Sequence, residues 1–426
     1  MSDLLSRDAQ YVWHPYTQMK TAPSPLPIVK GEGALLFTED GRTLIDGISS
    51  WWVNIHGHSH PYIAERIAAQ ALELEHVIFS GFTHPPAVDL AEKLIDILPG
   101  NMARVFYSDN GSTAVEIAVK MAIQYFYNQG MSRPGIIAFE QAFHGETFGA
   151  MSLSGELALF DAFEKHLFRV DRIPAPFPGR EQESLDALEA ILKQGDTCAF
   201  IFEPLIMGAG GMLMYEPEAL DALIKCCHEH GALAIADEVM TGFGRTGKIF
   251  ACDYLEETPD LMCLAKGLTG GVLPLSATVC TADIFNAFYS EDKKRTLFHG
   301  HSFTANPLGC AAALASMDLT LSETCQNSIA RLTARHRAFI EEVKAHPTLI
   351  HIRARGTILA MEFHTPDATS YFNNMRDQLY NFFLDQDIIL RPLGNVVYVM
   401  PPYCLTDEQL EKIYAALREA MEAFKP

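Results

Sequence analysis

Short apolar runs alternate with helical patterns through the middle of this 426-residue chain. The runs have the length of β-strands and occur at 103–107, 135–139, 198–202, 232–236, 261–265 and 277–280. Continuous apolar runs of this length are typical of strands that are buried on both faces of a sheet. Their alternation with helices indicates βα units. We therefore predict an α/β fold whose large domain is built on a mostly parallel central sheet.

Two of these runs end on an ionisable residue. Asp237 follows the run at 232–236, and Lys266 follows the run at 261–265. Ligands of open α/β sheets bind outside the carboxyl ends of the strands. A lysine there can form a Schiff base with a pyridine-aldehyde cofactor, and a carboxylate can keep the ring nitrogen protonated. The alternatives are a structural ion pair or cap for Asp237 and a surface-reaching side chain for Lys266.

A third candidate segment, 109–116, follows the first strand and opens a helix. Thr113 and Glu116 have the spacing of a capping box. Gly111 and Ser112 lie where backbone N–H groups and the helix dipole attract an anion. Taken alone, the segment favours an ordinary turn and cap, but its place after a strand in the same sheet as Asp237 and Lys266 favours an anion site.

The chain is too long for one compact core, and its pattern changes after about residue 306. A long helical stretch at 307–344 leads to short strands near 356–362 and 396–400 and to a closing helix at 407–424. We expect residues 1–55 to be an N-terminal segment of the small domain and residues 56–305 to form the large cofactor-binding domain. Residues 306–426 are expected to form a C-terminal small α+β domain.

Composition excludes several classes of partner. The net charge of −21 argues against nucleic acid and anionic membranes. The N-terminus has no basic region followed by an apolar stretch, so no signal peptide is expected, and the longest apolar stretch, 198–215, is interrupted by Glu203 and glycines, so no membrane span is expected. Nine cysteines scattered through apolar runs indicate reduced thiols in a cytoplasmic protein.

Two further motifs are rejected as sites. The segment 242–247 matches the dinucleotide fingerprint G-x-G-x-x-G, but that fingerprint must join a strand directly to a helix. The histidines at 56, 58 and 60 and the group 226–230 lack the paired spacing of a zinc site. No metal is expected.

Taken together, these segments resemble the class III (subgroup II) pyridoxal-phosphate-dependent aminotransferases of fold type I, from about residue 30 to 420. The motifs that carry the resemblance, in order, are Asn110-Gly-Ser112, Phe143-His-Gly145, Glu203-Pro204, the segment 237–247, the segment 266–271 and Asn306-Pro307-Leu308.

The resemblance implies a role for each cofactor-binding residue. Lys266 would carry the pyridoxal phosphate, and Asp237 would bind its pyridine nitrogen. Gly111 and Ser112 would bind the phosphate, and Phe143 would stack on the ring. His301 and Ser302 would reach the cofactor from a partner subunit, so that a homodimer shares its active sites.

Three further segments, 13–19, 49–52 and 391–403, are similar to a biotin-synthesis branch of this class. That likeness implies conversion of 8-amino-7-oxononanoate to 7,8-diaminononanoate, with S-adenosylmethionine as the expected amino donor. The implied substrate-binding residues are Tyr16, which is also a catalytic candidate, and Trp51, Phe143, Lys266, Gly300 and Arg391. Without the likeness, Trp51 is equally a packed core residue, and Arg391 is an ordinary surface arginine.

Alternatives remain open at this point. One is another class III ω-amino-acid or diamine aminotransferase; the others are a nicotinamide-dependent oxidoreductase and a non-catalytic regulator. The sequence also departs from the branch at three places: Phe143 stands where tyrosine is usual, Met207 where glutamine is usual, and Gly300-His301-Ser302 where Gly-Pro-Thr is common. These departures affect fine substrate contacts, and the serine keeps the hydroxyl expected at the phosphate.

Overall fold

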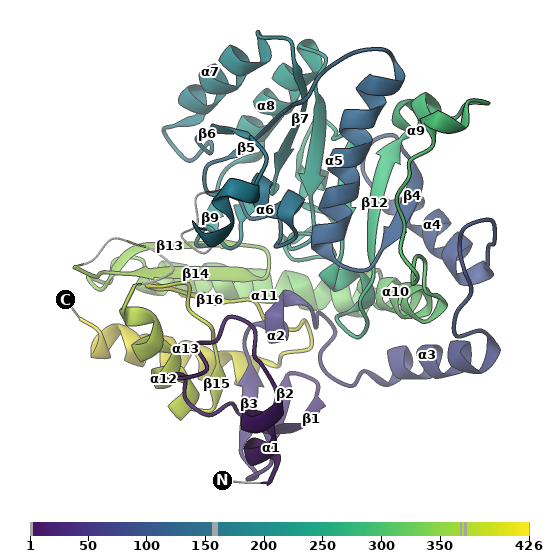
Figure 1. The fold of residues 1–426 in the computed structure, drawn as a ribbon. Coiled ribbons are helices and arrows are strands. Elements are labelled where there is room, and N and C mark those ends of the chain that lie inside the picture. The colour runs from purple at the N-terminus through teal and green to yellow at the C-terminus, as the bar shows by residue number, and fades with distance from the viewer. Residues whose placement is uncertain (1–2, 156–160, 367–368, 370–372, 426) are drawn as a thin grey trace.

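A seven-stranded sheet forms the centre of the larger lobe in this computed structural model, which describes residues 3–155, 161–366, 369 and 373–425 (Figure 1). The strand order is β4-β12-β11-β10-β7-β5-β6. The strands are β4 (Met102–Ser108), β5 (Gly135–Phe139), β6 (Asp171–Ile173), β7 (Thr197–Phe202), β10 (Leu233–Asp237), β11 (Leu261–Leu264) and β12 (Ser276–Thr281). Only β12 runs antiparallel to its neighbours. The predicted mostly parallel sheet is confirmed, and the edge strand β6 was not predicted because three residues give too little pattern.

Both faces of this sheet are buried, which explains the continuous apolar runs. In β5, Ile137 and Phe139 belong to one core cluster, whereas Ile136 and Ala138 belong to another. Helix α5 (Gly111–Asn128) covers the second cluster, and helices α7 (Glu181–Leu192) and α8 (Pro217–Glu229) contribute to the first. Each side chain of the strand is thereby removed from water whichever way it points.

The smaller lobe contains an antiparallel sheet of β13 (Leu349–Arg355), β14 (Ile358–Phe363) and β16 (Val396–Val399). Helices α11 (Glu323–Val343), α12 (Met375–Asp385) and α13 (Asp407–Ala423) lie in the same lobe (Figure 1). The predicted helical stretch over 307–344 is helical in the structure, but a break within it was not predicted. The stretch is divided into α10 (Pro307–Thr320) and α11, because the Ser322 side chain accepts the Cys325 N–H and starts a new helix.

The two ends of the chain share a sheet. Strands β1 (Ile28–Glu32), β2 (Leu35–Thr38) and β3 (Thr43–Asp46) are joined by β15 (Ile388–Ile389), which pairs parallel with β3. This pairing favours the assignment of residues 1–55 to the small domain. We keep the boundaries at 55 and 305 as a proposal.

The remaining elements connect these layers. They are α1 (Asp3–Tyr11), α2 (Ser49–Trp52), α3 (Pro61–Glu73), α4 (Pro85–Ile97), α6 (Phe148–Leu153), η1 (Asp161–His166), β8 (Ile206–Met207), β9 (Leu213–Met214), η2 (Ala251–Tyr254), η3 (Lys266–Thr269), α9 (Ala282–Phe288) and η4 (Lys293–Arg295). Within the described ranges, none of the helices combines the length and the apolarity needed to cross a membrane.

The glycine-rich segment 242–247 does not form a dinucleotide site. It runs through turns between β10 and the short helix η2 instead of joining a strand to a helix. Its Arg245 is buried and donates to the carbonyl oxygens of Pro401 (2.8 Å) and Trp52 (3.3 Å). Arg245 therefore connects the segment 242–247 with Trp52 near the N-terminus and with Pro401 near the C-terminus.

Candidate active site

Asp237 is the last residue of β10, and its carboxylate is fixed from two sides. His144 Nδ1 donates to Oδ2 (2.7 Å), and the Val239 N–H donates to Oδ1 (3.1 Å). Both side chains are buried, so the carboxylate keeps one orientation. His144 Nε2 is buried and has no hydrogen-bond partner among the described residues. The structure thus places a supported acid at the carboxyl end of the sheet, as predicted.

Lys266 lies two residues beyond the end of β11, in the first turn of η3. Its φ of 46° is uncommon for a residue that is not glycine. Burial lowers the pKa of its amine to about 8, although the carboxylates of Asp237 and Glu203 oppose this effect. Its Nζ lies 4.5 Å from the centre of the Trp52 ring. A lysine with a lowered pKa has more of the neutral amine that a nucleophile needs.

The N-terminus of α5 forms the third part of the site, but its cap differs from the prediction. Asn110 is the N-cap: its side chain accepts the Thr113 N–H, and the Thr113 hydroxyl accepts the Asn110 N–H. Glu116 is not part of this box. Its carboxylate instead accepts from the Thr147 hydroxyl (2.6 Å) and the Gly149 N–H (2.8 Å).

Two glycines leave the backbone bare beside this helix start. A Cβ on Gly111 would lie 2.8 Å from a Val239 methyl carbon, and a Cβ on Gly145 would lie 2.1 Å from the Ser112 hydroxyl oxygen. Gly145 also has a φ of 129°, which side chains disfavour. The Ser112 hydroxyl accepts the Glu146 N–H (3.1 Å). The result is a cradle of backbone and hydroxyl groups at a positive helix end, which is suited to a phosphate.

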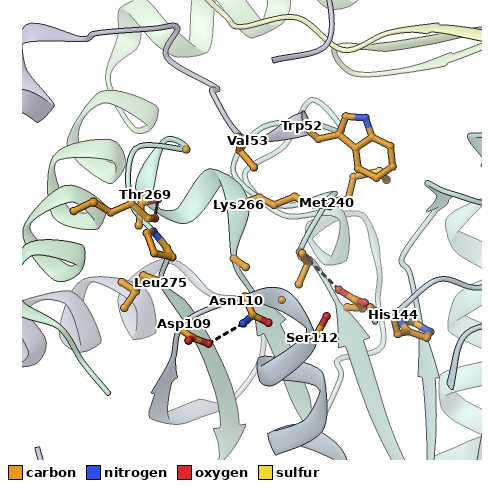
Figure 2. A pocket seen from close by; sticks show the side chains of 18 of the residues that line it. Trp52, Val53, Asp109, Asn110, Ser112, His144, Met240, Lys266, Thr269 and Leu275 are labelled. Carbon is orange, nitrogen blue, oxygen red and sulfur yellow. Dashed lines mark hydrogen bonds and ion pairs between the residues drawn. The ribbon is translucent and has the colours of Figure 1, made fainter. Parts of the chain in front are cut away.

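A single cavity of about 490 Å³ joins these three parts. Its lining includes Lys266, Asp237, Phe143 and the segment 109–112. In Figure 2, Lys266 and Trp52 lie on one side of the hollow, and Asn110 and Ser112 lie on the other. An amine, an acid and an anion cradle at one cavity fit the aldehyde, ring nitrogen and phosphate of pyridoxal phosphate.

Glu203 and Trp52 also line this cavity, and the sequence did not identify either as a site residue. The Glu203 carboxylate accepts the N–H groups of Phe143 and Gly208, both at 2.9 Å. Burial raises its pKa to about 7. An isolated carboxylate after the strand at 198–202 was the available signal for Glu203. For Trp52 the sequence offered only its pairing with Trp51.

The structure brings the predicted substrate residues Tyr16, Trp51 and Arg391 together, and Trp51 directly precedes Trp52, which lines this cavity. The Arg391 guanidinium lies 4.5 Å from the centre of the Trp51 ring, and the Tyr16 ring packs edge-on against Trp51 at 5.5 Å. Tyr16 and Arg391 also line a second cavity of about 610 Å³. Among the described residues, no carboxylate forms an ion pair with Arg391. The guanidinium is thereby available to a carboxylate of a ligand.

Gly300, His301 and Ser302 are not among the described residues that line either cavity. They lie in the loop before α10, where the His301 N–H donates to the Thr304 hydroxyl (3.1 Å). Their contribution from a partner subunit stays a prediction.

Comparison with known proteins gives a consistent result. The family model for class-III aminotransferases matches residues 16–421. A relative from Synechococcus elongatus, named adenosylmethionine-8-amino-7-oxononanoate aminotransferase, is 49% identical and covers 97% of this chain and 98% of its own. The solved structure of the enzyme with that name from Methanocaldococcus jannaschii has a TM-score of 0.94 at 36% identity and covers 99% of both chains. An omega transaminase from Pseudomonas jessenii in complex with PMP has a TM-score of 0.92 at 27% identity and covers 100% of both chains.

The fold is therefore that of a fold type I pyridoxal-phosphate-dependent enzyme. The chain belongs to the class-III aminotransferases, whose cofactor is pyridoxal 5'-phosphate.

Proposed function

We propose that this chain converts 8-amino-7-oxononanoate to 7,8-diaminononanoate in biotin biosynthesis, with S-adenosylmethionine as the amino donor. The observation that carries the proposal is the contact of Tyr16 and Arg391 with Trp51, the residue before Trp52, which lines the Lys266 cavity. The oxononanoate has a carboxylate at one end and a keto group at the other. Arg391 can bind the carboxylate while the keto group reaches Lys266. The relative at 49% identity over 97% of the chain supports the same substrate.

Within the first cavity, we assign Lys266 to the cofactor aldehyde and Asp237 to the ring nitrogen. Gly111 and Ser112 are assigned to the phosphate, and Phe143 to the ring face. When bound, pyridoxal phosphate supplies an aldehyde that takes up the amino group and a ring that withdraws electrons from the adjacent carbon.

The side chains of this chain supply the proton transfers and the orientation. Lys266 Nζ removes the proton from the donor carbon that carries the amine and returns a proton during the second half of the reaction. His144 holds the Asp237 carboxylate in place through its Nδ1–H. Tyr16 and Trp51 form an aromatic wall along the substrate chain, and Arg391 fixes the distal end. Phe143 provides a ring face but no phenolic hydrogen bond.

The alternative is an ω-amino-acid or diamine aminotransferase of the same class, and a substrate panel separates the two. We expect the purified enzyme to aminate 8-amino-7-oxononanoate with adenosylmethionine or lysine, and not to use β-alanine or putrescine with a common keto acid. Comparing adenosylmethionine with lysine settles the donor. Product formation, followed by mass spectrometry, is the measurement. Preference for β-alanine or putrescine would overturn the proposal, as would a bound nicotinamide in place of a visible pyridoxal absorbance.

The active form is proposed to be a homodimer with shared sites. Four apolar side chains, Ile78, Phe82, Phe298 and Phe303, are 57–75% exposed. The first two lie in residues 76–84 and the last two lie on either side of Gly300–Ser302, and the two segments meet where the ring centres of His76 and Phe303 lie 5.2 Å apart. A second copy would bury these side chains, and it would bring its own His301 and Ser302 with them.

For the dimer, we expect a sedimentation mass of about twice 47.2 kDa. Phe303→Asp should shift the mass toward that of one chain and reduce activity, because each site would lose its partner residues. Tyr127→Asp alters an aromatic residue of similar exposure on α5 and should change neither. A fully active monomer would contradict shared sites.

We place the enzyme in the cytoplasm, since all nine of its cysteines are free thiols, as in proteins of reducing compartments. Detection of the protein in a secreted fraction would contradict this placement.

A further inference from the structure

The turn at residues 49–52 has a backbone conformation that non-glycine residues rarely adopt. Ser49, Ser50 and Trp52 have φ values of 52°, 59° and 69°. Ser50 combines its φ of 59° with a ψ of −83°, close to the rare and strained γ-turn of positive φ. Conformations of this kind persist only where the surrounding structure enforces them, and they cluster at functional sites.

The Asp46 carboxylate enforces this turn. It is fully buried at the end of β3. Oδ1 accepts the Ile48 N–H (3.1 Å), and Oδ2 accepts the Ser50 N–H (2.7 Å). His58 Nε2 lies 2.8 Å from Oδ2, so the imidazole donates to the carboxylate and fixes its orientation. One carboxylate thus binds two backbone donors of the turn.

The turn places both tryptophans of the site, but it holds them differently. Trp52 has anchors that do not involve Asp46: its Nε1 donates to the Tyr398 hydroxyl (2.9 Å), and its carbonyl accepts from Arg245 (3.3 Å). Trp51 instead contacts the Arg391 guanidinium and the Tyr16 ring. Trp51 is therefore more dependent on the turn for its position than Trp52.

We propose that Asp46, oriented by His58, is a positioning residue for the binding site of the amino acceptor. It would fix the position of Trp51, which contacts Tyr16 and Arg391. The carboxylate stabilises the conformation of the turn through its hydrogen bonds to backbone N–H groups. The turn fixes the position of Trp51, and the Trp51 ring in turn positions the Arg391 guanidinium that binds the acceptor's carboxylate. The identity of the acceptor rests on the proposed function, whereas the control of Trp51 by Asp46 does not.

Asp46→Asn tests this proposal because the amide keeps the shape of the carboxylate. Its oxygen can still accept a hydrogen bond, but its NH2 group cannot, so one of the two backbone N–H groups of the turn loses its acceptor. The expected result is a rise of about tenfold in the KM for 8-amino-7-oxononanoate. The kcat should change much less, because Trp52 keeps its own anchors and Lys266 belongs to η3, which the Asp46 carboxylate does not contact. A purely structural role would instead reduce the folded fraction and leave the KM of the folded enzyme unchanged.

A spectroscopic arm requires no substrate. The chain has three tryptophans, so a Trp13→Phe background leaves only Trp51 and Trp52. In that background, Asp46→Asn should alter the near-ultraviolet circular dichroism of the holoenzyme. Adding Ser50→Gly should restore part of the KM and of the spectrum, because glycine adopts the φ of this position without strain.

Asp387→Asn is the matched control. Asp387 lies just before β15 in the same sheet, and its carboxylate accepts from Arg42 Nε (2.9 Å) and not from the N–H groups of Ile48 or Ser50. Its variant should retain the wild-type KM and spectrum. An unchanged KM and spectrum in Asp46→Asn would overturn the proposal. If the wild-type enzyme does not use the oxononanoate, the proposed function fails, and the spectrum alone decides the role of Asp46.

Discussion

Replacing Lys266 with alanine is expected to abolish transamination while the protein still folds. Lys266 is the only lysine among the described residues that line the first cavity, so no other amine is in place to bind the cofactor aldehyde or to move the proton. Loss of general acid–base catalysis alone costs about 10²–10⁴-fold in rate, and loss of the covalent role adds to it. We therefore expect no detectable product in a steady-state assay at the enzyme concentration that gives wild-type turnover.

Two comparisons make this result specific. Lys248→Ala removes an exposed lysine whose Nζ contacts the Asp253 carbonyl, and it should retain wild-type turnover. Unchanged far-ultraviolet circular dichroism of Lys266→Ala would show that the loss is chemical. Full transamination by Lys266→Ala would reject the assignment of this residue and with it the proposed chemistry.

The main features of the large domain could be predicted from the sequence because its strands are buried on both faces. Such strands appear as uninterrupted apolar runs, and an ionisable residue at their end is conspicuous. Asp237 and Lys266 were identified in this way, and the structure brings both to one cavity. The break at Ser322 was not located because the surrounding sequence has neither glycine nor proline, and a single serine is also common in turns.

The parts of the site that residue patterns alone could not predict depend on long-range contacts. Trp51 and Arg391 are 340 positions apart in the sequence, and only the family resemblance connected them before the structure placed them together. The role of Asp46 follows from positive φ angles and from hydrogen bonds to backbone N–H groups. Side-chain patterns carry no information about either. The same limit applies to Gly300, His301 and Ser302, whose assigned roles require a second chain.

Asp237→Asn is expected to reduce kcat by about 10²–10³-fold, the usual loss when one preorganised electrostatic contact is removed from a site. The amide keeps the volume of the carboxylate and can still accept from His144 or Val239. It lacks the negative charge that would hold a proton on the cofactor ring nitrogen. Stopped-flow measurement of each half-reaction should show the loss in the proton-transfer steps.

The pH dependence of Asp237→Asn separates two explanations of the lower kcat: loss of the negative charge at the ring nitrogen, and increased protonation of Lys266. The Asp237 carboxylate raises the pKa of Lys266, so its removal should lower that pKa and increase the fraction of neutral amine at neutral pH. The acidic limb of the rate profile should then move to lower pH while the maximum rate falls. A rate that fell because Lys266 had become more protonated would show the opposite shift and would contradict the role assigned to Asp237. Asp260→Asn is the matched control, because Asp260 pairs with His228 at the opposite end of the strands (3.2 Å), far from the cavity, and it should keep the wild-type kcat.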